Sequence, residues 1–406
     1  MRYVADLHLH SPYARASSRF MTFGTLAYWA RRKGIDLLAS ADFTHPVWLE
    51  ETARTLQPVE GDLFEHGGVR FVLGTEVNCS FQRRGRRHNV HMLAFVPGLE
   101  AARRLAAAVA PYGDLAEDGR PSLAMTARDF VEAVGATDPR SFVIAAHVWT
   151  PWYSALGSWS GFDSLEACFE DMAPAVFCVE TGLSSDPAMN WRVADLDSRT
   201  IVSFSDAHSP PRLGREVTVI DGDLTFDGLR EALRRGSVAY TVEFYPEEGK
   251  YHWTGHRGHV KLPPGEVRRL GKRCPVCGRR MTVGVADRVE ALASRAVTVH
   301  RDADGFLRGD AGRPPYRLLV PLQEILAEAL GVKVGTKTVD RAYEAVIDAV
   351  GPELSVLQEA PLEAIARAAG ERVAQGVDRV RRGEISIDPG YDNTYGVVRV
   401  WPEAAE

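Results

Sequence analysis

The chain has 406 residues, which is room for two or three domains of ~100–200 residues each. Its formal net charge is −6, which does not suggest a bulk nucleic-acid binder, because such proteins are usually basic. The charge does not exclude nucleic-acid binding, because bound metal ions would add positive charge. No stretch approaches the ~18 uncharged apolar residues that span a membrane, and a strand pattern begins at Tyr3. Together with five cysteines that lack disulfide-like spacing, this predicts a cytoplasmic protein without a signal peptide or membrane partner.

Residues 1 to about 244 alternate short apolar runs with helical patterns. Helices are expected from Phe23 to Lys33, from Leu99 to Ala110, and from Phe226 to a glycine stop at Gly236. Strands that alternate with helices predict βα units and a parallel sheet. With this many units a barrel is favoured over an open sheet, so we expect an α/β barrel domain at 1–244.

Composition shifts after this barrel. Residues 245–300 are rich in glycine, histidine, proline and arginine, and the motif Cys-Pro-Val-Cys-Gly occupies 274–278. Residues 301–406 begin with turns and continue with three patterns of helical spacing that start near Leu322, Val339 and Leu362. The chain closes with a turn-rich stretch between two strand-like pieces. We expect a small zinc-binding segment at 245–300 and a helical C-terminal domain with a strand–turn tail at 301–406.

Histidine and carboxylate residues recur in the apolar runs, in or just after each predicted strand. A barrel of parallel strands has its active site at the C-terminal strand ends. One histidine at such a place is usually a surface or core residue, but a whole series left unpaired would be costly. Imidazole and carboxylate without thiolate are the ligands of a hydrolytic Zn, Mn or Fe centre. The candidate ligands are His8, His10, Asp42, His45, Glu76, His91, His147, Asp206 and His208.

Alternate residues of a strand point to one side, so His8 and His10 can reach one ion or two adjacent ions. Asp6 lies on the same face and either binds metal or orients a histidine. Metals at such a site neutralise a phosphate and lower the pKa of a bound water. The catalytic candidates are Asp206, Glu76 and His147, although the sequence does not separate a base role from a ligand role.

This series resembles the motifs of the polymerase and histidinol phosphatase (PHP) superfamily. The resemblance implies a distorted (β/α)₇ barrel that holds two or three divalent metals (Zn, Mn, Mg or Fe) and hydrolyses phosphoesters. Two departures concern the third metal: Phe43 stands where a histidine often follows Asp42, and no further histidine follows His10. His45 is the candidate substitute, and the number of metals is left open.

The Cys274-x-x-Cys277 pair is half of a tetrahedral zinc site, which needs four ligands. His252, His256 and His259 lie upstream, and two of them, with His256 and His259 favoured, complete a Cys₂His₂ set. The alternative is a redox or incidental pair, but no thioredoxin-like βαβ pattern surrounds it. We expect one structural zinc, because a small polar segment needs a metal to hold its fold.

The whole chain resembles the endonuclease Q family, the lesion-specific DNA endonucleases built on a PHP domain. The segments that carry the resemblance are Ala-Asp-Phe-Thr-His-Pro at 41–46, Ala-His-Val-Trp-Thr-Pro-Trp at 146–152, Glu-Thr-Gly-Leu-Ser-Ser-Asp at 180–186, Ser-Asp-Ala-His-Ser at 205–209, the zinc motif and Ile-Asp-Pro-Gly-Tyr-Asp at 387–392. It implies cleavage of damaged double- or single-stranded DNA, at the phosphodiester 5′ to deaminated bases (uracil, hypoxanthine, xanthine) or abasic sites. One departure is His259, where relatives tend to carry a cysteine.

Two groups of residues are candidates for DNA contact. Trp149, Trp152 and Tyr153 follow His147, and aromatic rings beside a metal can stack on a flipped base. Packing of a barrel loop explains them equally well. An arginine run after the Glu76 strand fits a phosphate-contacting loop, or else a solvated face. Its members are Arg83, Arg84, Arg86 and Arg87.

We therefore expect a metal-dependent DNA repair endonuclease. One rival is a small-molecule phosphatase of the histidinol-phosphate type, which leaves the zinc segment and the tail without a role. The other is a non-catalytic metal-dependent DNA-binding module, against which the complete ligand series argues.

Overall fold

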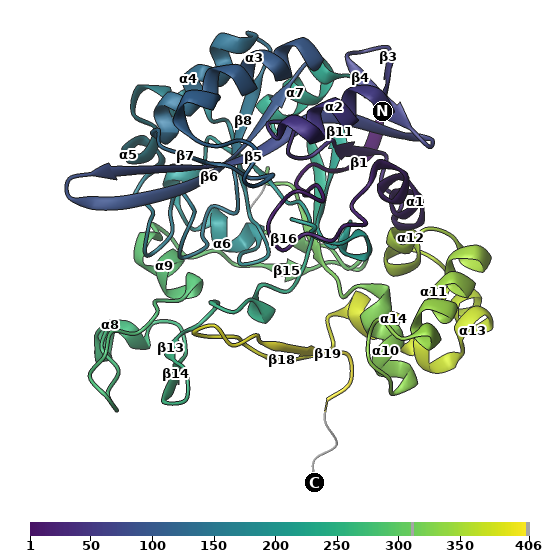
Figure 1. The fold of residues 1–406 in the computed structure, drawn as a ribbon. Helices are drawn as coiled ribbons and strands as arrows, with labels where there is room; N and C mark the ends of the chain where they lie inside the picture. Colours follow the sequence, from purple (N-terminus) through teal and green to yellow (C-terminus); the bar gives the residue numbers. More distant parts are fainter. Residues whose placement is uncertain (310–311, 403–406) are drawn as a thin grey trace.

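The apolar runs form one mixed β-sheet in the computed structural model, which describes residues 1–309 and 312–402 (Figure 1). In spatial order the strands are β10 (Thr200–Val202), β9 (Cys178–Glu180), β8 (Phe142–Ala145), β6 (Arg86–Val96), β5 (Val69–Arg83), β2 (Leu37–Ala39), β1 (Arg2–Asp6), β11 (Val217–Asp221), β12 (Val238–Glu243), β17 (Tyr316–Leu318), β16 (Leu307–Arg308) and β15 (His300–Arg301). Beside this path, β3 (Gln57–Val59) pairs with β4 (Leu63–His66), and β4 and β7 (Ser122–Leu123) each pair with β5.

The pairing is parallel between β1 and β2, β2 and β5, β8 and β9, and β9 and β10. It is antiparallel between β5 and β6, β6 and β8, and β1 and β11. A tight turn joins β5 to β6, which forces that pair to run antiparallel. The segments after β1 and β10 meet through a bridge between Leu9 and Ala207. The α/β class is confirmed, while the distorted (β/α)₇ barrel stays a prediction.

Helices cover the sheet, and α3, α4 and α7 lie together above it in Figure 1. Helix α1 buries Phe23, Leu26 and Ala30, as its apolar spacing predicts, and ends at Gly34 with φ 83°, a left-handed conformation that glycine favours. No helix among the described residues combines the length and apolar character needed to cross a membrane. The helices here are α1 (Phe23–Lys33), α2 (Pro46–Thr55), α3 (Leu99–Val109), α4 (Ala127–Thr137), α5 (Leu165–Phe169), α6 (Pro187–Trp191) and α7 (Phe226–Arg235).

The segment after β12 leaves the sheet and forms a small unit with its own core of Leu262, Cys274 and Met281. The chain then returns to the sheet, because Tyr316 of β17 pairs with Thr241 of β12. The sequence predicted turns before residue 315, and the short β15 and β16 lie within that stretch. The unit contains β13 (Thr254–His256), β14 (Val260–Leu262), α8 (Glu266–Leu270) and α9 (Val285–Leu292).

The last part is helical, as expected, and it packs against the main body on the right of Figure 1. A hairpin follows the helices and extends back towards β13 and β14. The helices are α10 (Leu322–Leu330), α11 (Lys337–Val350), α12 (Glu353–Gln358), α13 (Leu362–Ala369) and α14 (Glu371–Arg382), and the hairpin is β18 (Ser386–Asp388) with β19 (Val397–Arg399).

A buried ion pair joins this helical part to the sheet domain. The Lys33 ammonium at the end of α1 lies 2.6 Å from the Glu353 carboxylate, and their side chains are 2% and 4% exposed. The same carboxylate accepts hydrogen bonds from the Tyr343 hydroxyl at 2.9 Å and the Leu322 backbone N–H at 3.0 Å. All four groups are thus mutually satisfied inside the contact.

Replacing Lys33 with methionine should lower the free energy of unfolding by about 3–5 kcal/mol, because it leaves a buried carboxylate without its cation. Urea denaturation followed by circular dichroism measures this loss. The matched control is Arg32→Met, whose partner Glu344 lies at the surface and for which we expect less than ~1 kcal/mol. Equal losses in the two variants would contradict this role for the buried pair.

Candidate metal centre

The predicted ligands lie where strands of the sheet end or pass the centre. His8 and His10 follow β1, and His147 follows β8. Asp206 and His208 follow β10, on the segment that meets the end of β1. Glu76 and His91 lie within the long strands β5 and β6. Their register, with Asn78 opposite His91, puts both side chains on one face of the hairpin.

These side chains form three overlapping groups in which the donor atoms lie within 4.8 Å of one another. His10 and Glu76 are each shared by two groups, so the groups form one continuous cluster. The groups are His8 with His10 and Glu76, His10 with Asp206 and His208, and Glu76 with His91 and His147.

Glu76 is the hub of this cluster. Its Oε1 lies 2.7 Å from Nδ1 of His91, and its Oε2 lies 3.2 Å from Nε2 of His10. Burial raises the pKa of Glu76, but the close ring of His91 and the charge of Arg120 outweigh it and hold the pKa well below its usual range. Glu76 is therefore an anion with its side chain 1% exposed, surrounded by nitrogen donors.

The donor set fits divalent metal ions. Nε2 of His8 is buried and has no hydrogen-bond partner among the described residues, although it lies 3.4 Å from Glu76 and 3.5 Å from Asp206. A buried polar atom without a partner is costly, and a cation among these donors would satisfy it. Burial lowers the pKa of His91 to about 4, which leaves the neutral imidazole that binds metals.

Two of the predicted ligands lie outside these groups. Asp42 Oδ1 faces Nδ1 of His10 at 3.2 Å, and its Oδ2 accepts the Ser11 backbone N–H at 2.6 Å, so Asp42 orients His10. His45 begins helix α2 instead, where its ring accepts a hydrogen bond from the backbone N–H of Trp48 at 3.4 Å. That His45 substitutes for a histidine at position 43 stays a prediction.

Three further residues support the centre, and only one of them was considered from the sequence. Glu180 at the end of β9 accepts from Nδ1 of His8 at 2.9 Å and from the backbone N–H of His147 at 2.7 Å. Arg120 lies 3.2 Å from Glu76 and is 22% exposed, at the edge of the cluster. Asp6 accepts the backbone N–H of Ser205 and thereby holds the Asp206 segment. Glu180 ends a strand, which was the available signal.

The aromatic residues after His147 differ in their placement. Trp149 is fully buried and donates its indole N–H to Asn190 at 2.8 Å, so it packs in the loop. Trp152 stacks on Trp159, with ring centroids 5.9 Å apart. Tyr153 is 47% exposed, and its ring lies 4.9 Å from the ring of the candidate ligand His91. Of the three, Tyr153 is the exposed ring next to the centre.

The arginine run lies at the far end of the β5–β6 hairpin. Arg83 pairs with Glu170 at 3.0 Å, and Arg86 donates to the Trp159 carbonyl. The side chains of Arg84 and Arg87 are exposed and make no hydrogen bond or ion pair within the part of the chain that the structure describes.

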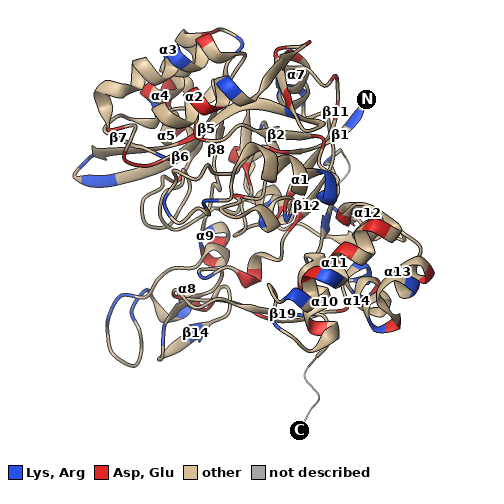
Figure 2. Cartoon of the chain, turned by 45° about the vertical axis from the view of Figure 1, so that its right-hand side comes forward, with Lys and Arg blue, Asp and Glu red and all other residues tan. Residues whose placement is uncertain are grey.

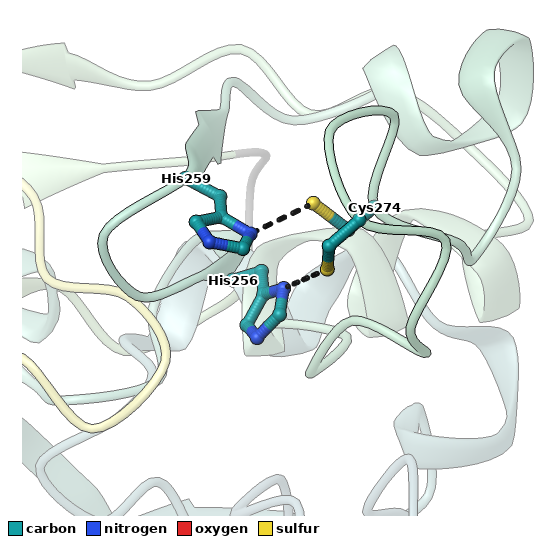
Figure 3. Close-up of side chains that lie close together, drawn as sticks. His256, His259 and Cys274 are labelled. Atoms are coloured by element: carbon teal, nitrogen blue, oxygen red, sulfur yellow. Dashed lines mark hydrogen bonds between the residues drawn. The ribbon is translucent and has the colours of Figure 1, made fainter.

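The four predicted zinc ligands come together in the small unit. Sγ of Cys277 lies 3.2 Å from Nδ1 of His256, and Sγ of Cys274 lies 3.6 Å from Nδ1 of His259 (Figure 3). Burial raises the pKa of the Cys274 thiol, but hydrogen bonds from the Cys277 backbone and from His256 outweigh it and lower the pKa to about 6. A thiolate and imidazoles in this arrangement fit a tetrahedral zinc. His252 lies outside the group.

Comparison with known proteins places the chain among several relatives. The family model of the MJ0043 C-terminal domain matches residues 321–384. The uncharacterized protein MJ0043 of Methanocaldococcus jannaschii is 30% identical over 68% of this chain, which spans 35% of that protein's length. The uncharacterized protein YqxK of Bacillus subtilis is 26% identical over 97% of this chain and 98% of its own.

Two solved structures cover nearly the whole chain. The lesion-specific endonuclease PfuEndoQ of Pyrococcus furiosus is 33% identical with a TM-score of 0.85, over 99% of this chain and 96% of its own. Endonuclease Q in complex with a 27-mer duplex that has an abasic lesion at the active site gives the same identity and TM-score, over 99% and 97%.

Proposed function

Because the chain belongs to the endonuclease Q family, we propose that it is a metal-dependent DNA repair endonuclease that hydrolyses the phosphodiester 5′ to deaminated bases or abasic sites. The observation that carries the proposal is the continuous cluster centred on Glu76, in which imidazoles and carboxylates converge from five strands or strand ends. The DNA partner is proposed from the endonuclease Q complex, whose duplex has its abasic lesion at the active site.

In this proposal two or three divalent metals are held by His8, His10, Glu76, His91, His147, Asp206 and His208. When bound, they neutralise the phosphate and lower the pKa of water. Asp42 and Glu180 orient His10 and His8, because each accepts from the ring nitrogen that faces away from the cluster.

Exposure distinguishes the roles of the carboxylates. Asp206 is 26% exposed, so an attacking water reaches it, and Asp206 accepts the proton of that water. Glu76 is 1% exposed and acts as a ligand that joins the groups. His147 faces Glu76 at 3.2 Å and is 11% exposed, which also suits a ligand. Arg120 at the edge of the cluster donates to a phosphate oxygen of the substrate.

The other parts of the chain bind the substrate in this proposal. The unit of β13, β14, α8 and α9, which we propose contains one structural zinc, and the helical part lie on the same side of the sheet domain in Figure 1. Both grip the damaged duplex and help to form the lesion pocket. Tyr153 supplies an exposed aromatic face beside the centre for an unstacked base.

An assay with labelled duplex that contains one deoxyuridine, one deoxyinosine or one abasic site tests the proposal, with Mg²⁺, Mn²⁺ or Zn²⁺ added to the metal-stripped protein. We expect a nick 5′ to the lesion, no nick in the undamaged duplex and no nick without metal. Binding without cutting under every metal would support the rival DNA-binding module. Phosphate release from small esters without nicking would support the rival phosphatase.

A further inference from the structure

The turn of the β5–β6 hairpin contains an arginine at an unfavourable position. Arg83 pairs directly with Arg86, so Arg84 and Gly85 form a two-residue turn, with φ of 49° and 75°. Both residues of such a turn need positive φ, which asparagine, aspartate and glycine tolerate best. The exposed side chain of Arg84 makes no hydrogen bond or ion pair among the described residues that offsets this strain. A strained residue without an internal role is a candidate for an external one.

The arginines of this hairpin fall into two pairs. Arg83 and Arg86 are occupied, by Glu170 and by the Trp159 carbonyl. Arg84 and Arg87 are exposed and have no partner among the described residues, so their guanidinium groups are free to bind an anion. Figure 2 shows this positive charge at the end of the hairpin, which projects beyond the helices of the main body.

The strand register connects Arg87 to the metal centre. Arg87 lies opposite Gln82, and His91 lies opposite Asn78. Because side chains alternate along a strand, Arg87 shares one face of the hairpin with His91 and with Glu76. The position opposite Arg87 is six residues beyond Glu76, which corresponds to about 20 Å at ~3.4 Å per residue. At ~3.4 Å per step of B-form DNA, this is about six base pairs.

We propose that Arg84 and Arg87 bind the phosphate backbone of the duplex that flanks the lesion, about six base pairs from the scissile phosphate. The inference rests on the proposed function, because it takes damaged duplex DNA as the substrate. Guanidinium groups bind phosphates with two hydrogen bonds each, and the rigid hairpin fixes their distance from the metals. This contact holds the duplex beside the lesion in line with the metal centre. It does not distinguish one base from another, because it reaches only phosphates.

The test is duplex binding by the variant Arg84→Asn/Arg87→Gln, measured by fluorescence anisotropy between 50 and 300 mM salt. We expect binding on the order of tenfold weaker at 100 mM salt, and a log–log salt slope shallower by about 1–2, since each phosphate contact contributes ~0.9. The control is Arg54→Gln/Arg103→Gln, which removes the same charge from the exposed surface of α2 and α3 and should bind like the wild type.

The length of the flank gives a second readout. The wild type should bind more weakly when the duplex on one side of the lesion is trimmed from twelve to three base pairs, and the hairpin variant should not respond to trimming. Asparagine suits the left-handed turn, so Arg84→Asn alone should melt at the same or a higher temperature, which separates lost binding from lost folding.

Equal affinity and salt slope for the wild type and the hairpin variant would overturn the inference. Binding is measured without cleavage, so it decides the inference even if no nick forms. Absence of a nick in the wild type would instead refute the proposed nuclease.

Discussion

The variant Asp206→Asn is expected to cleave lesion-containing duplex about 10²–10⁴-fold more slowly than the wild type in single turnovers. The carboxylate Oδ1 lies 3.1 Å from Nε2 of His10 and 3.5 Å from Nε2 of His8. Burial raises the pKa of Asp206, but the facing charge of His8 and the hydrogen bond from His10 outweigh it and hold the pKa well below its usual range. An amide of the same shape keeps the packing but loses the anion and the proton acceptor.

The measurement is the rate of nicking with Mg²⁺, Mn²⁺ and Zn²⁺ in turn, together with metal content by mass spectrometry. The matched control is Glu117→Gln, which removes an exposed carboxylate from the loop that leads to Arg120 and should nick at the wild-type rate. Full activity of Asp206→Asn under any of the metals would remove Asp206 from the catalytic residues.

The second large effect is expected from Cys274→Ala, which should unfold β13, β14 and α8. A structural zinc in a small domain contributes about 10–16 kcal/mol to folding in peptide systems, far more than a core of three residues supplies. Hydrogen exchange should show lost protection across residues 254–281, while β1 to β12 stay protected, as does α9, whose Val285 and Val289 pack into the main core. The rate of cleavage should also fall, because the unfolded segment can no longer make its proposed contact with the duplex.

The control for this variant is Val276→Ala, in the same turn between the two cysteines. Val276 is 68% exposed and offers no ligand atom, so its zinc content and exchange pattern should match the wild type. Unchanged zinc content and unchanged protection in Cys274→Ala would refute the structural zinc.

Much of the centre could be predicted from sequence, because each ligand interrupts an apolar run that has to be a strand. Glu180 was missed although it ends the strand Cys178–Glu180, because the sequence alone does not show that its carboxylate faces His8 and the backbone of His147. Arg120 lies in a loop, where no periodicity relates it to Glu76. Its position depends on the folded path of the chain.

The sequence also did not show which way some side chains point or how deeply they are buried. His45 is three residues from Asp42, but the helix that starts there turns its ring to Trp48. Trp149 is two residues from His147, and the turn between them points the indole into the core. Apolar alternation likewise predicts that β5 and β6 are strands, while only the two-residue turn decides that they run antiparallel.

The hairpin of β18 and β19 affects the order in which parts of the chain fold during synthesis. Asp392 accepts the backbone N–H of Arg257, 135 positions earlier, and the hydroxyl of Thr282, 110 positions earlier. Because synthesis proceeds from the N-terminus, these contacts form only after Asp392 has been made. All candidate ligands of the cluster centred on Glu76 lie within the first 208 residues. A nascent chain therefore contains every candidate ligand of this centre before the contacts of Asp392 with Arg257 and Thr282 can form. Those contacts hold the small unit that we propose binds DNA.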